Sequence, residues 1–141
     1  MHHYPKTKRN YTKLNQRDVS KQVYTFCTST RDEAILAQND SMYIVANRVA
    51  YDRFKGYAVA DHLLVIPKQH RESLDEFTQE EVLDYHELTS KYERLGYSIY
   101  ARGFGSSTRS VAHQHTHLIK LTGKGPKILV YTARPHALIV R

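Results

Sequence analysis

Short apolar runs along the chain predict the strands of a sheet. The segment Met42–Asn47 is rich in β-branched and aromatic residues, which favour strands. Leu63–Ile66 is continuously apolar and is closed by Pro67, a pattern typical of a central strand buried on both faces. Arg48–Ala60 mixes charges with a glycine and is predicted to be a loop. Four further strands are predicted at Tyr97–Ala101, Val111–Leu118, Ile128–Thr132 and Ala137–Val140.

The clearest helical pattern follows the central apolar run. Thr78–Glu81 has the spacing of a capping box, and Phe77 and Val82 are placed for a hydrophobic staple. A second capping-box pattern at Thr30–Glu33 predicts a short N-terminal helix that extends to about Gln38. The long helix is predicted to end at Gly96, after an apolar stripe that repeats every three or four residues through Val82, Tyr85, Leu88, Tyr92 and Leu95.

Together these elements predict a single α+β domain. We expect a mostly antiparallel sheet of about five strands, with one long helix packed on it and the short N-terminal helix. The length of 141 residues leaves little room for a second domain. Residues 1–22 have no apolar period and carry a net charge of +5, so they are predicted to form a basic N-terminal arm. The domain is then expected to span residues 23–141.

Charge is distributed unevenly along the chain. The net charge is +7, but residues 23–93 carry −6 and residues 94–141 carry +8 with no acid at all. A uniformly basic nucleic-acid-binding protein would not show this pattern. Much of the middle acidity is interpreted as the solvated face of the long helix. The acid-free segment instead favours an anionic ligand near the C-terminal half of the chain.

Composition also excludes several classes of protein. The longest apolar run, Leu63–Pro67, is the size of a strand, so no membrane span is predicted. The N-terminus lacks the apolar region of a secretory signal, and Cys27 stands alone, which excludes an internal disulfide and a cysteine-rich zinc site. These observations lead us to expect a cytoplasmic protein.

Three alternating histidines, His113, His115 and His117, carry the strongest chemical signal. On a strand, alternate side chains share a face, so the three imidazoles would project together. Their spacing of roughly 7 Å per pair prevents all three from readily binding one zinc ion. Two of them with His62 or His70 would form a metal site, which stays an alternative. The other interpretation is nucleophilic catalysis at phosphorus, and the preceding Gly103–Ser110 loop favours it because its glycines, hydroxyls and Arg109 suit an oxyanion.

The residues resemble the histidine triad (HIT) family of nucleotide hydrolases and transferases. Ser110–Ile119, with the order Ser-Val-Ala-His-Gln-His-Thr-His-Leu-Ile, is similar to the family's triad pattern. His62–His70, followed by Leu74 and the helix start, is similar to the strand and loop that precede the triad. Val45–Arg48 is similar to the family strand whose Asn or Asp binds ribose. The resemblance covers about residues 42–119, and the first forty residues have no counterpart.

The resemblance implies a site for a nucleoside monophosphate. His115 would be the nucleophile that forms a nucleotidyl-histidine, His113 and His117 would orient it and share protons, and His62 would lie behind them. Ser110 and Arg109 would bind phosphate oxygens. Asn47 would bind the ribose, and Tyr43 or Ile44 would line an apolar slot for the base. Arg109 stands where the family often has Gln. Gln114 and Thr116 replace apolar residues, so the reverse face of the triad strand is expected to be wetter than usual.

The implied activity is hydrolysis of nucleotidyl conjugates, such as nucleoside phosphoramidates or dinucleoside polyphosphates. No cofactor or metal would be required, and a divalent cation would enter only with the substrate. We expect a purine nucleotide as ligand and a homodimer, as the resemblance implies. Two alternatives remain: a nucleotidyltransferase, against which His117 argues, and a nucleotide- or nucleic-acid-binding module that uses the basic arm.

Overall fold

The computed structural model describes residue 26, residues 34–123 and residue 125, and the account below concerns these residues. In chain order, the elements are β1 (Ile35–Gln38), β2 (Met42–Ala46), β3 (Arg53–Phe54), β4 (Tyr57–Pro67), the 3₁₀ turn η2 (Leu74–Glu76), α3 (Gln79–Arg94), β5 (Tyr97–Ala101) and β6 (Thr116–Leu121). The α+β class predicted from the sequence is confirmed, with six strands and one long helix.

The strands form one antiparallel sheet with the order β1-β2-β4-β6-β5, and β3 pairs with the start of β4. β4 is the central strand, as its apolar run predicted. It pairs with β2 on one side, where Ile44 faces Val65, and with β6 on the other, where Leu63 faces Leu118. Because side chains alternate along a strand, these residues line one face of the sheet and their neighbours line the other.

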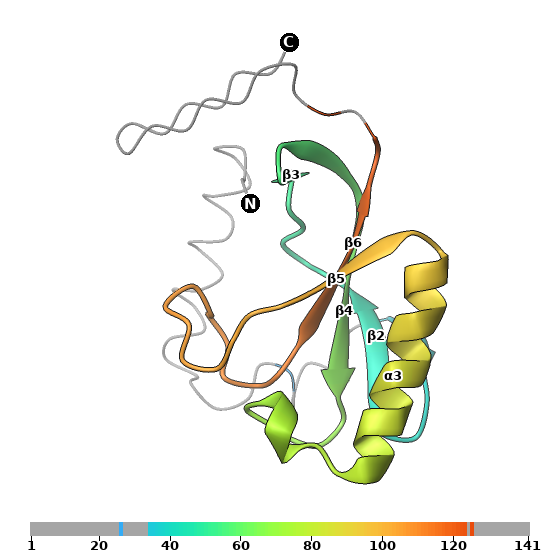
Figure 1. The fold of residues 1–141 in the computed structure, drawn as a ribbon, viewed down its shortest axis with the longest axis vertical. Helices are drawn as coiled ribbons and strands as arrows, with labels where there is room; N and C mark the ends of the chain where they lie inside the picture. Colours follow the sequence, from blue (N-terminus) through green and yellow to red (C-terminus); the bar gives the residue numbers. More distant parts are fainter. Residues whose placement is uncertain (1–25, 27–33, 124, 126–141) are drawn as a thin grey trace.

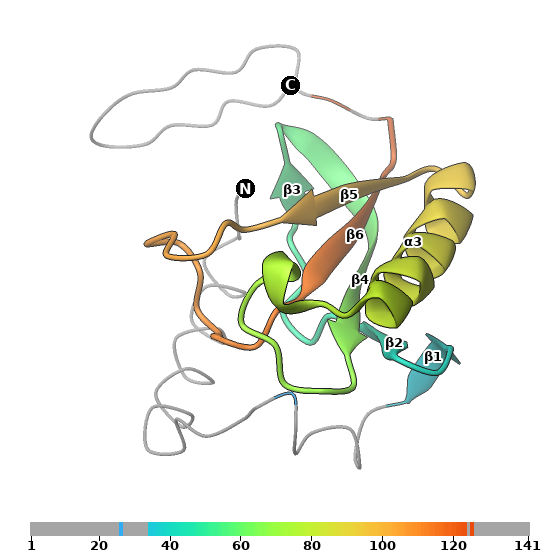
Figure 2. The same cartoon turned by 60° about the horizontal axis from the view of Figure 1, so that its bottom comes forward.

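The helix α3 covers the first of these faces (Figures 1 and 2). Its start is the predicted capping box: the Glu81 backbone N–H donates to Thr78 Oγ1, and the Thr78 backbone N–H donates to the Glu81 carboxylate. Gly96 ends it with a φ of 86°, a conformation that glycine adopts without strain. A hydrophobic core forms between the helix and the sheet, and its buried residues are Met42, Ile44, Leu63, Val65, Leu88 and Leu118.

The opposite face of the sheet carries a different set of side chains. Tyr43, Val45, Leu64 and Ile66 pack there around Phe26. Tyr51 and Phe54 extend this layer over Ile119 of β6. The long helix lies on the other face, so the side chains of β4 and β6 that point to this face are not packed against α3.

Two sequence predictions for the first half of the domain were wrong. Arg48–Ala60 is not wholly a loop, because it contains β3 and the first residues of β4. Lys55 and Gly56 both have positive φ, which makes the tight turn of a two-residue hairpin. Residues 35–38 form the edge strand β1 rather than the end of a helix, because pairing with β2 outweighs the local capping signal at residues 30–33.

A third error concerns the triad segment. Val111–Leu118 was predicted to be a strand, but β6 begins only at Thr116. Residues 111–115 follow an irregular path, and the pairing of β6 with both β5 and β4 ends at Thr116. The prediction that the reverse face of this segment is more hydrated than usual is also wrong, because Gln114 and Thr116 are both buried. Thr116 is satisfied there by a 3.0 Å hydrogen bond with the Tyr85 hydroxyl of α3.

Several predictions fall on residues that the structure does not describe. These are the 1–22 arm, the first part of the N-terminal helix, and the strands at 128–132 and 137–140. Within the described ranges, no helix has the length and apolar composition that crossing a membrane requires.

Truncation of Leu118 tests the core between α3 and the sheet. We expect Leu118→Ala to lower the free energy of unfolding by about 2–5 kcal/mol, because it leaves a cavity in a fully buried position. Leu36→Ala, at an exposed position of the edge strand β1, is the matched control and should change it by about 0.5 kcal/mol or less. Urea unfolding measures both, and equal effects of the two variants would contradict this description of the core.

Candidate active site

Four buried histidines gather on the face of the sheet opposite α3. His62 belongs to β4 and His117 to β6, and both are nearly inaccessible to solvent. His113 and His115 lie in the irregular segment that leads into β6. The ring centroids of His115 and His117 are 5.1 Å apart, as are those of His62 and His117. The fold therefore brings all four predicted histidines together, although only His117 of the triad is on a strand.

Hydrogen bonds assign the protons of His62 and His117. The backbone N–H of Tyr51 donates to His62 Nδ1 at 3.0 Å, so this nitrogen carries no proton. The neutral ring is then protonated at Nε2, which donates to His117 Nδ1 at 2.9 Å. His117 in turn carries its proton on Nε2. That atom is buried and has no hydrogen-bond partner among the described residues.

His115 has the opposite tautomer. Its Nδ1 lies 2.9 Å from the backbone carbonyl oxygen of His113, which can only accept, so Nδ1 carries the proton. Nε2 therefore keeps its lone pair. The ring is held from the side by Phe26, whose centroid is 5.2 Å away in an edge-on arrangement. His115 thus has an imidazole nitrogen in the form a nucleophile requires.

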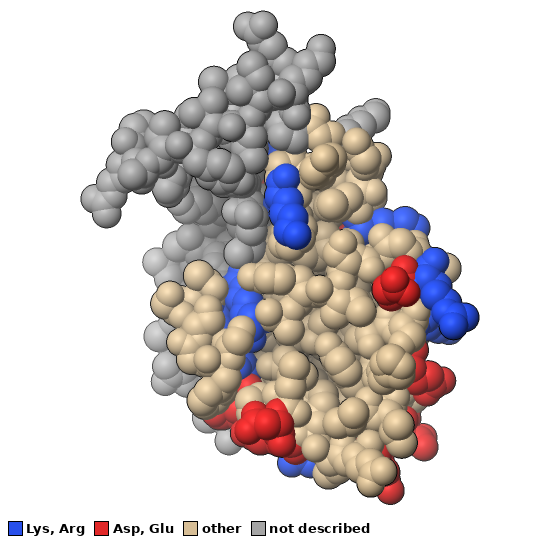
Figure 3. Space-filling view, in the orientation of Figure 1, with Lys and Arg blue, Asp and Glu red and all other residues tan. Residues whose placement is uncertain are grey.

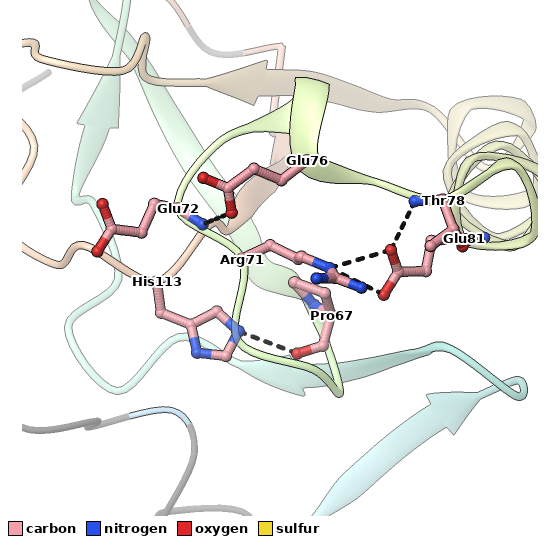
Figure 4. Close-up of polar contacts among 7 residues, drawn as sticks. All are labelled: Pro67, Arg71, Glu72, Glu76, Thr78, Glu81 and His113. Atoms are coloured by element: carbon pink, nitrogen blue, oxygen red, sulfur yellow. Dashed lines mark hydrogen bonds and ion pairs between the residues drawn. The ribbon is translucent and has the colours of Figure 1, made fainter.

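The helix cap fixes His113 through a short series of contacts (Figure 4). The Glu81 carboxylate accepts from Arg71 Nε at 3.1 and 3.2 Å, while also completing the capping box. The backbone carbonyl of Arg71 accepts from the Gln114 N–H at 2.6 Å. His113 Nε2 donates to the carbonyl oxygen of Pro67 at 3.0 Å. Two carbonyls of the loop after β4 therefore hold the segment whose own carbonyl orients His115.

Burial keeps the triad uncharged. It lowers the pKa of His113 to about 4, and His70 and Arg109 add to this effect. It lowers the pKa of His117 to about 2, and His62 and Arg102 add to that effect. Burial likewise lowers the pKa of His115, and the positive charges of Arg109 and Arg102 act in the same direction. At neutral pH the three imidazoles are neutral bases beside two guanidinium groups, an environment that favours an anionic ligand.

The predicted role of Arg109 at phosphate stays a prediction, and the structure adds contacts of its guanidinium with the backbone. Its Nε donates to the Val111 carbonyl at 3.0 Å, and Nη2 donates to the carbonyls of Ala112 and Glu72. Arg109 therefore ties the triad segment to the loop after β4. The prediction missed this role because backbone carbonyls of an irregular segment leave no sequence signature.

The predicted nucleotide-binding residues lie in different places. Asn47 places its side-chain nitrogen 3.1 Å from His62 Nε2 and 3.4 Å from Nδ1, and its Oδ1 accepts from the Val49 N–H, so it contacts the His62 ring. Tyr43 lies on the site face and donates to the Phe26 carbonyl at 3.0 Å. Ser110 is exposed at the end of the Gly103–Ser110 loop. Roles on ribose, base and phosphate stay predictions for these three residues.

Ile44 was placed in the wrong layer. It is fully buried in the core beneath α3, because it alternates with Tyr43 along β2. A base bound on the histidine face cannot contact it. Of the two residues proposed for the base slot, only Tyr43 faces the correct side of the sheet.

Sequence reasoning missed Tyr51, Phe26 and Arg102. Tyr51 supplies the N–H that fixes His62, and its ring lies 4.3 Å from the His62 ring. Arg102 follows β5 directly and donates to the Tyr51 hydroxyl at 3.0 Å. The antiparallel pairing of Ala101 with Thr116 places Arg102 across from the His115 segment. That pairing of two predicted strands was the available signal for Arg102, whereas no motif marks Tyr51 or Phe26.

The described residues contain no group of three or more His, Cys, Asp or Glu side chains arranged to hold a metal ion. Asp61 precedes His62 on β4, and its carboxylate accepts from the His62 backbone N–H at 2.8 Å and from the Tyr97 hydroxyl at 2.5 Å.

Comparison with solved structures identifies the fold. A member of the HIT family from Bacillus subtilis is 25% identical, with a TM-score of 0.55 over 72% of this chain and 74% of that one. A HIT family hydrolase from Clostridium thermocellum is 20% identical, with a TM-score of 0.54 over 74% of this chain and 95% of that one. A hypothetical histidine triad nucleotide-binding protein from Sulfolobus tokodaii is 17% identical, with a TM-score of 0.54 over 81% and 79%.

The protein therefore has the HIT fold, as its sequence motifs implied. Comparisons with protein-family models and with curated proteins give no match. At these identities the solved structures define the fold, and the chemistry has to be argued from the site itself.

The neutral triad predicts that the protein loses stability in mild acid. A histidine with an unfolded pKa near 6.5 and a folded pKa near 4 binds a proton first in the unfolded state, so stability falls as pH decreases below about 6.5. Between pH 7.5 and 5.5 we expect a loss of about 1 kcal/mol for each such histidine. Urea unfolding at several pH values measures this loss.

Two variants assign the effect to the triad. His113→Gln should lower the pH dependence of unfolding by about one proton, because it removes one group that stays neutral in the folded state. His86→Gln on the exposed face of α3 should leave the dependence unchanged. A wild-type stability that is flat over this range would contradict the buried, uncharged triad.

Proposed function

We propose that this protein is a HIT-type hydrolase of nucleotidyl conjugates, with His115 as the nucleophile. The observation that carries the proposal is the tautomer of His115, whose Nδ1–H is engaged by the His113 carbonyl so that Nε2 keeps its lone pair. The HIT hydrolases with the same fold make the reaction class a natural expectation. The substrate would be a purine nucleotide joined through its α-phosphate to an amine or to a further phosphate.

In the first step, His115 Nε2 forms a bond to the α-phosphorus while the bond from phosphorus to the leaving group breaks. The leaving group departs with the bonding electron pair, and His115 becomes a positively charged nucleotidyl-histidine. The His113 carbonyl, already 2.9 Å from Nδ1, stabilises that charge by accepting its hydrogen bond. His117 Nε2–H and Ser110 would donate to phosphate oxygens.

In the second step, water attacks the same phosphorus and the bond to Nε2 breaks. His115 returns to its neutral form, the nucleoside monophosphate is released, and one proton passes to solvent. A bound phosphoryl anion would raise the pKa of the buried imidazoles, because a nearby negative charge favours their protonated form. The site thus has groups to orient the nucleophile and to stabilise charge, and this scheme assigns no step to a metal ion.

Replacement of His115 tests the proposed nucleophile. His115→Asn should reduce turnover of an adenylyl conjugate by at least about 10³-fold, because the covalent route is lost. His86→Asn is the matched control on the surface of α3 and should keep wild-type turnover. Rapid quenching in alkali followed by mass spectrometry should detect a nucleotidyl adduct on the wild type and none on His115→Asn.

The same assay tests the role of metal. Activity should survive treatment with a chelator if, as proposed, a divalent cation enters only with the substrate. Turnover by His115→Asn at the wild-type rate would overturn the proposed nucleophile. Complete loss of activity on chelation, restored by zinc, would favour a metal enzyme instead.

We further propose that the protein forms a homodimer through α3 and β5. β5 is an edge strand among the strands that the structure describes, and large apolar side chains are exposed on both elements, including Leu83 and Ile99. A strand at the edge of the described sheet and these side chains suit a two-fold contact with a second copy. In Figure 3, acidic side chains lie toward the lower end of the molecule, and acidic and basic side chains both lie along its α3 side.

The dimer is tested by light scattering at micromolar concentration. Wild type should have twice the chain mass of 16.4 kDa, and Ile99→Glu should shift the population toward monomer because it buries a charge at the contact. Leu36→Glu, at the opposite edge of the sheet, is the control and should remain dimeric. A monomeric wild type, or dissociation by Leu36→Glu alone, would contradict the proposed interface.

A further inference from the structure

Arg102 is one of two described arginines near the proposed nucleophile, the other being Arg109. It directly follows β5, whose last residue, Ala101, pairs with Thr116, the residue after His115. Residues opposite each other in an antiparallel pair project to the same side of the sheet. Tyr100, the residue before Ala101, pairs with His117, and the two rings lie on the same side of the sheet with their centroids 5.8 Å apart.

Hydrogen bonds to described residues help to hold the guanidinium of Arg102 in this position. Nη2 donates to the Tyr51 hydroxyl at 3.0 Å, and Nη1 donates to the Thr108 carbonyl of the Gly103–Ser110 loop. The Tyr51 ring lies 5.5 Å from that of His117, so the guanidinium lies at the border of the triad. Arg102 as a whole is partly exposed.

The charge of Arg102 reaches both reacting imidazoles. It contributes to the lowered pKa values of His115 and His117, whereas the charge of Arg109 contributes to those of His113 and His115. Arg109 is tied to three backbone carbonyls at the other end of the triad segment. The two arginines therefore differ in place, and Arg102 is the one on the His117 side of the nucleophile.

We propose that Arg102 binds the leaving group of the substrate and directs the enzyme toward conjugates whose leaving group is a phosphate chain rather than an amine. This inference rests on the proposed nucleotidyl hydrolase and specifies its substrate class. When the bond between the α-phosphorus and the bridging oxygen breaks, the electron pair stays on the departing phosphate. A fixed guanidinium stabilises this charge as it develops and pairs with phosphate oxygens through its planar donors.

The protonation of the triad supports the same preference. A departing phosphate needs no proton at neutral pH, whereas an amine has to be protonated as its bond to phosphorus breaks. His117 is the imidazole with an uncommitted N–H among the described residues, and burial lowers its pKa to about 2. Before substrate binds, it is therefore a neutral hydrogen-bond donor and a weak acid. A site with a cation and a neutral donor suits an anionic leaving group better than an amine.

Leaving-group dependence tests the proposal. The kcat/KM for a diadenosine triphosphate and for an adenosine 5′-phosphoramidate is compared in wild type, Arg102→Gln and Arg102→Lys. Wild type should prefer the triphosphate. Arg102→Gln should lose about 10²–10³-fold on the triphosphate, the magnitude of losing one transition-state donor, and less than about 10-fold on the phosphoramidate. Arg102→Lys keeps the charge without the planar fork and should fall between the two.

Arg94→Gln on the exposed end of α3 is the control for a change in net charge and should alter neither rate. An equal loss on both substrates would overturn the proposal, because it would mean that Arg102 only positions the loop through Thr108. A wild type that prefers the phosphoramidate would also overturn it, and this result does not depend on how well the variants fold. Absence of wild-type turnover on both substrates would instead refute the proposed hydrolase.

Discussion

The hydrogen bond from the Tyr51 backbone N–H to His62 Nδ1 sets the tautomers of two of the four clustered histidines, His62 and His117. An amide N–H can only donate, so His62 has to accept at Nδ1 and carry its proton on Nε2. This proton points at His117 Nδ1 and forces the His117 proton onto Nε2. A single main-chain contact thereby orders two imidazoles, and burial lowers the pKa of His117, which opposes a second proton on that ring.

The nucleophile depends on a second main-chain contact of the reverse kind. The His113 carbonyl can only accept, so His115 donates from Nδ1 and presents an unprotonated Nε2. Its position follows from the helix: the Glu81 side chain caps α3 and binds Arg71, whose carbonyl holds Gln114. The first turn of α3 is thus connected to the reacting nitrogen through a few polar contacts. The Glu81 carboxylate therefore both stabilises the start of α3 and helps to position the segment that carries the proposed nucleophile.

The sequence predicted the elements whose signals are local or strongly periodic. The capping box at Thr78, the stripe through Leu88 and the apolar run of β4 are confirmed because each is satisfied within one element or across one face. The hairpin turn at Lys55 escaped prediction, since lysine rarely adopts positive φ. The strand β1 escaped because its pairing with β2 is a tertiary effect that outweighs a local helix signal.

The site was predictable in its histidines and less so in their surroundings. Alternation correctly grouped His113, His115 and His117, but the strand geometry assumed for them holds only at His117. Arg109 donates to backbone carbonyls that no residue pattern identifies, and its assignment to phosphate stays a prediction. Arg102 was overlooked, because its nearness to His115 depends on the pairing of β5 with β6 rather than on any motif.

The tautomer of His115 is the point on which the proposed chemistry depends, and nitrogen NMR of the ¹⁵N-histidine-labelled protein at neutral pH measures it directly. We expect His115 to be neutral and protonated at Nδ1, with His62, His113 and His117 neutral and protonated at Nε2. A proton on Nε2 of His115, or a charged His115 ring at that pH, would contradict its assignment as the nucleophile.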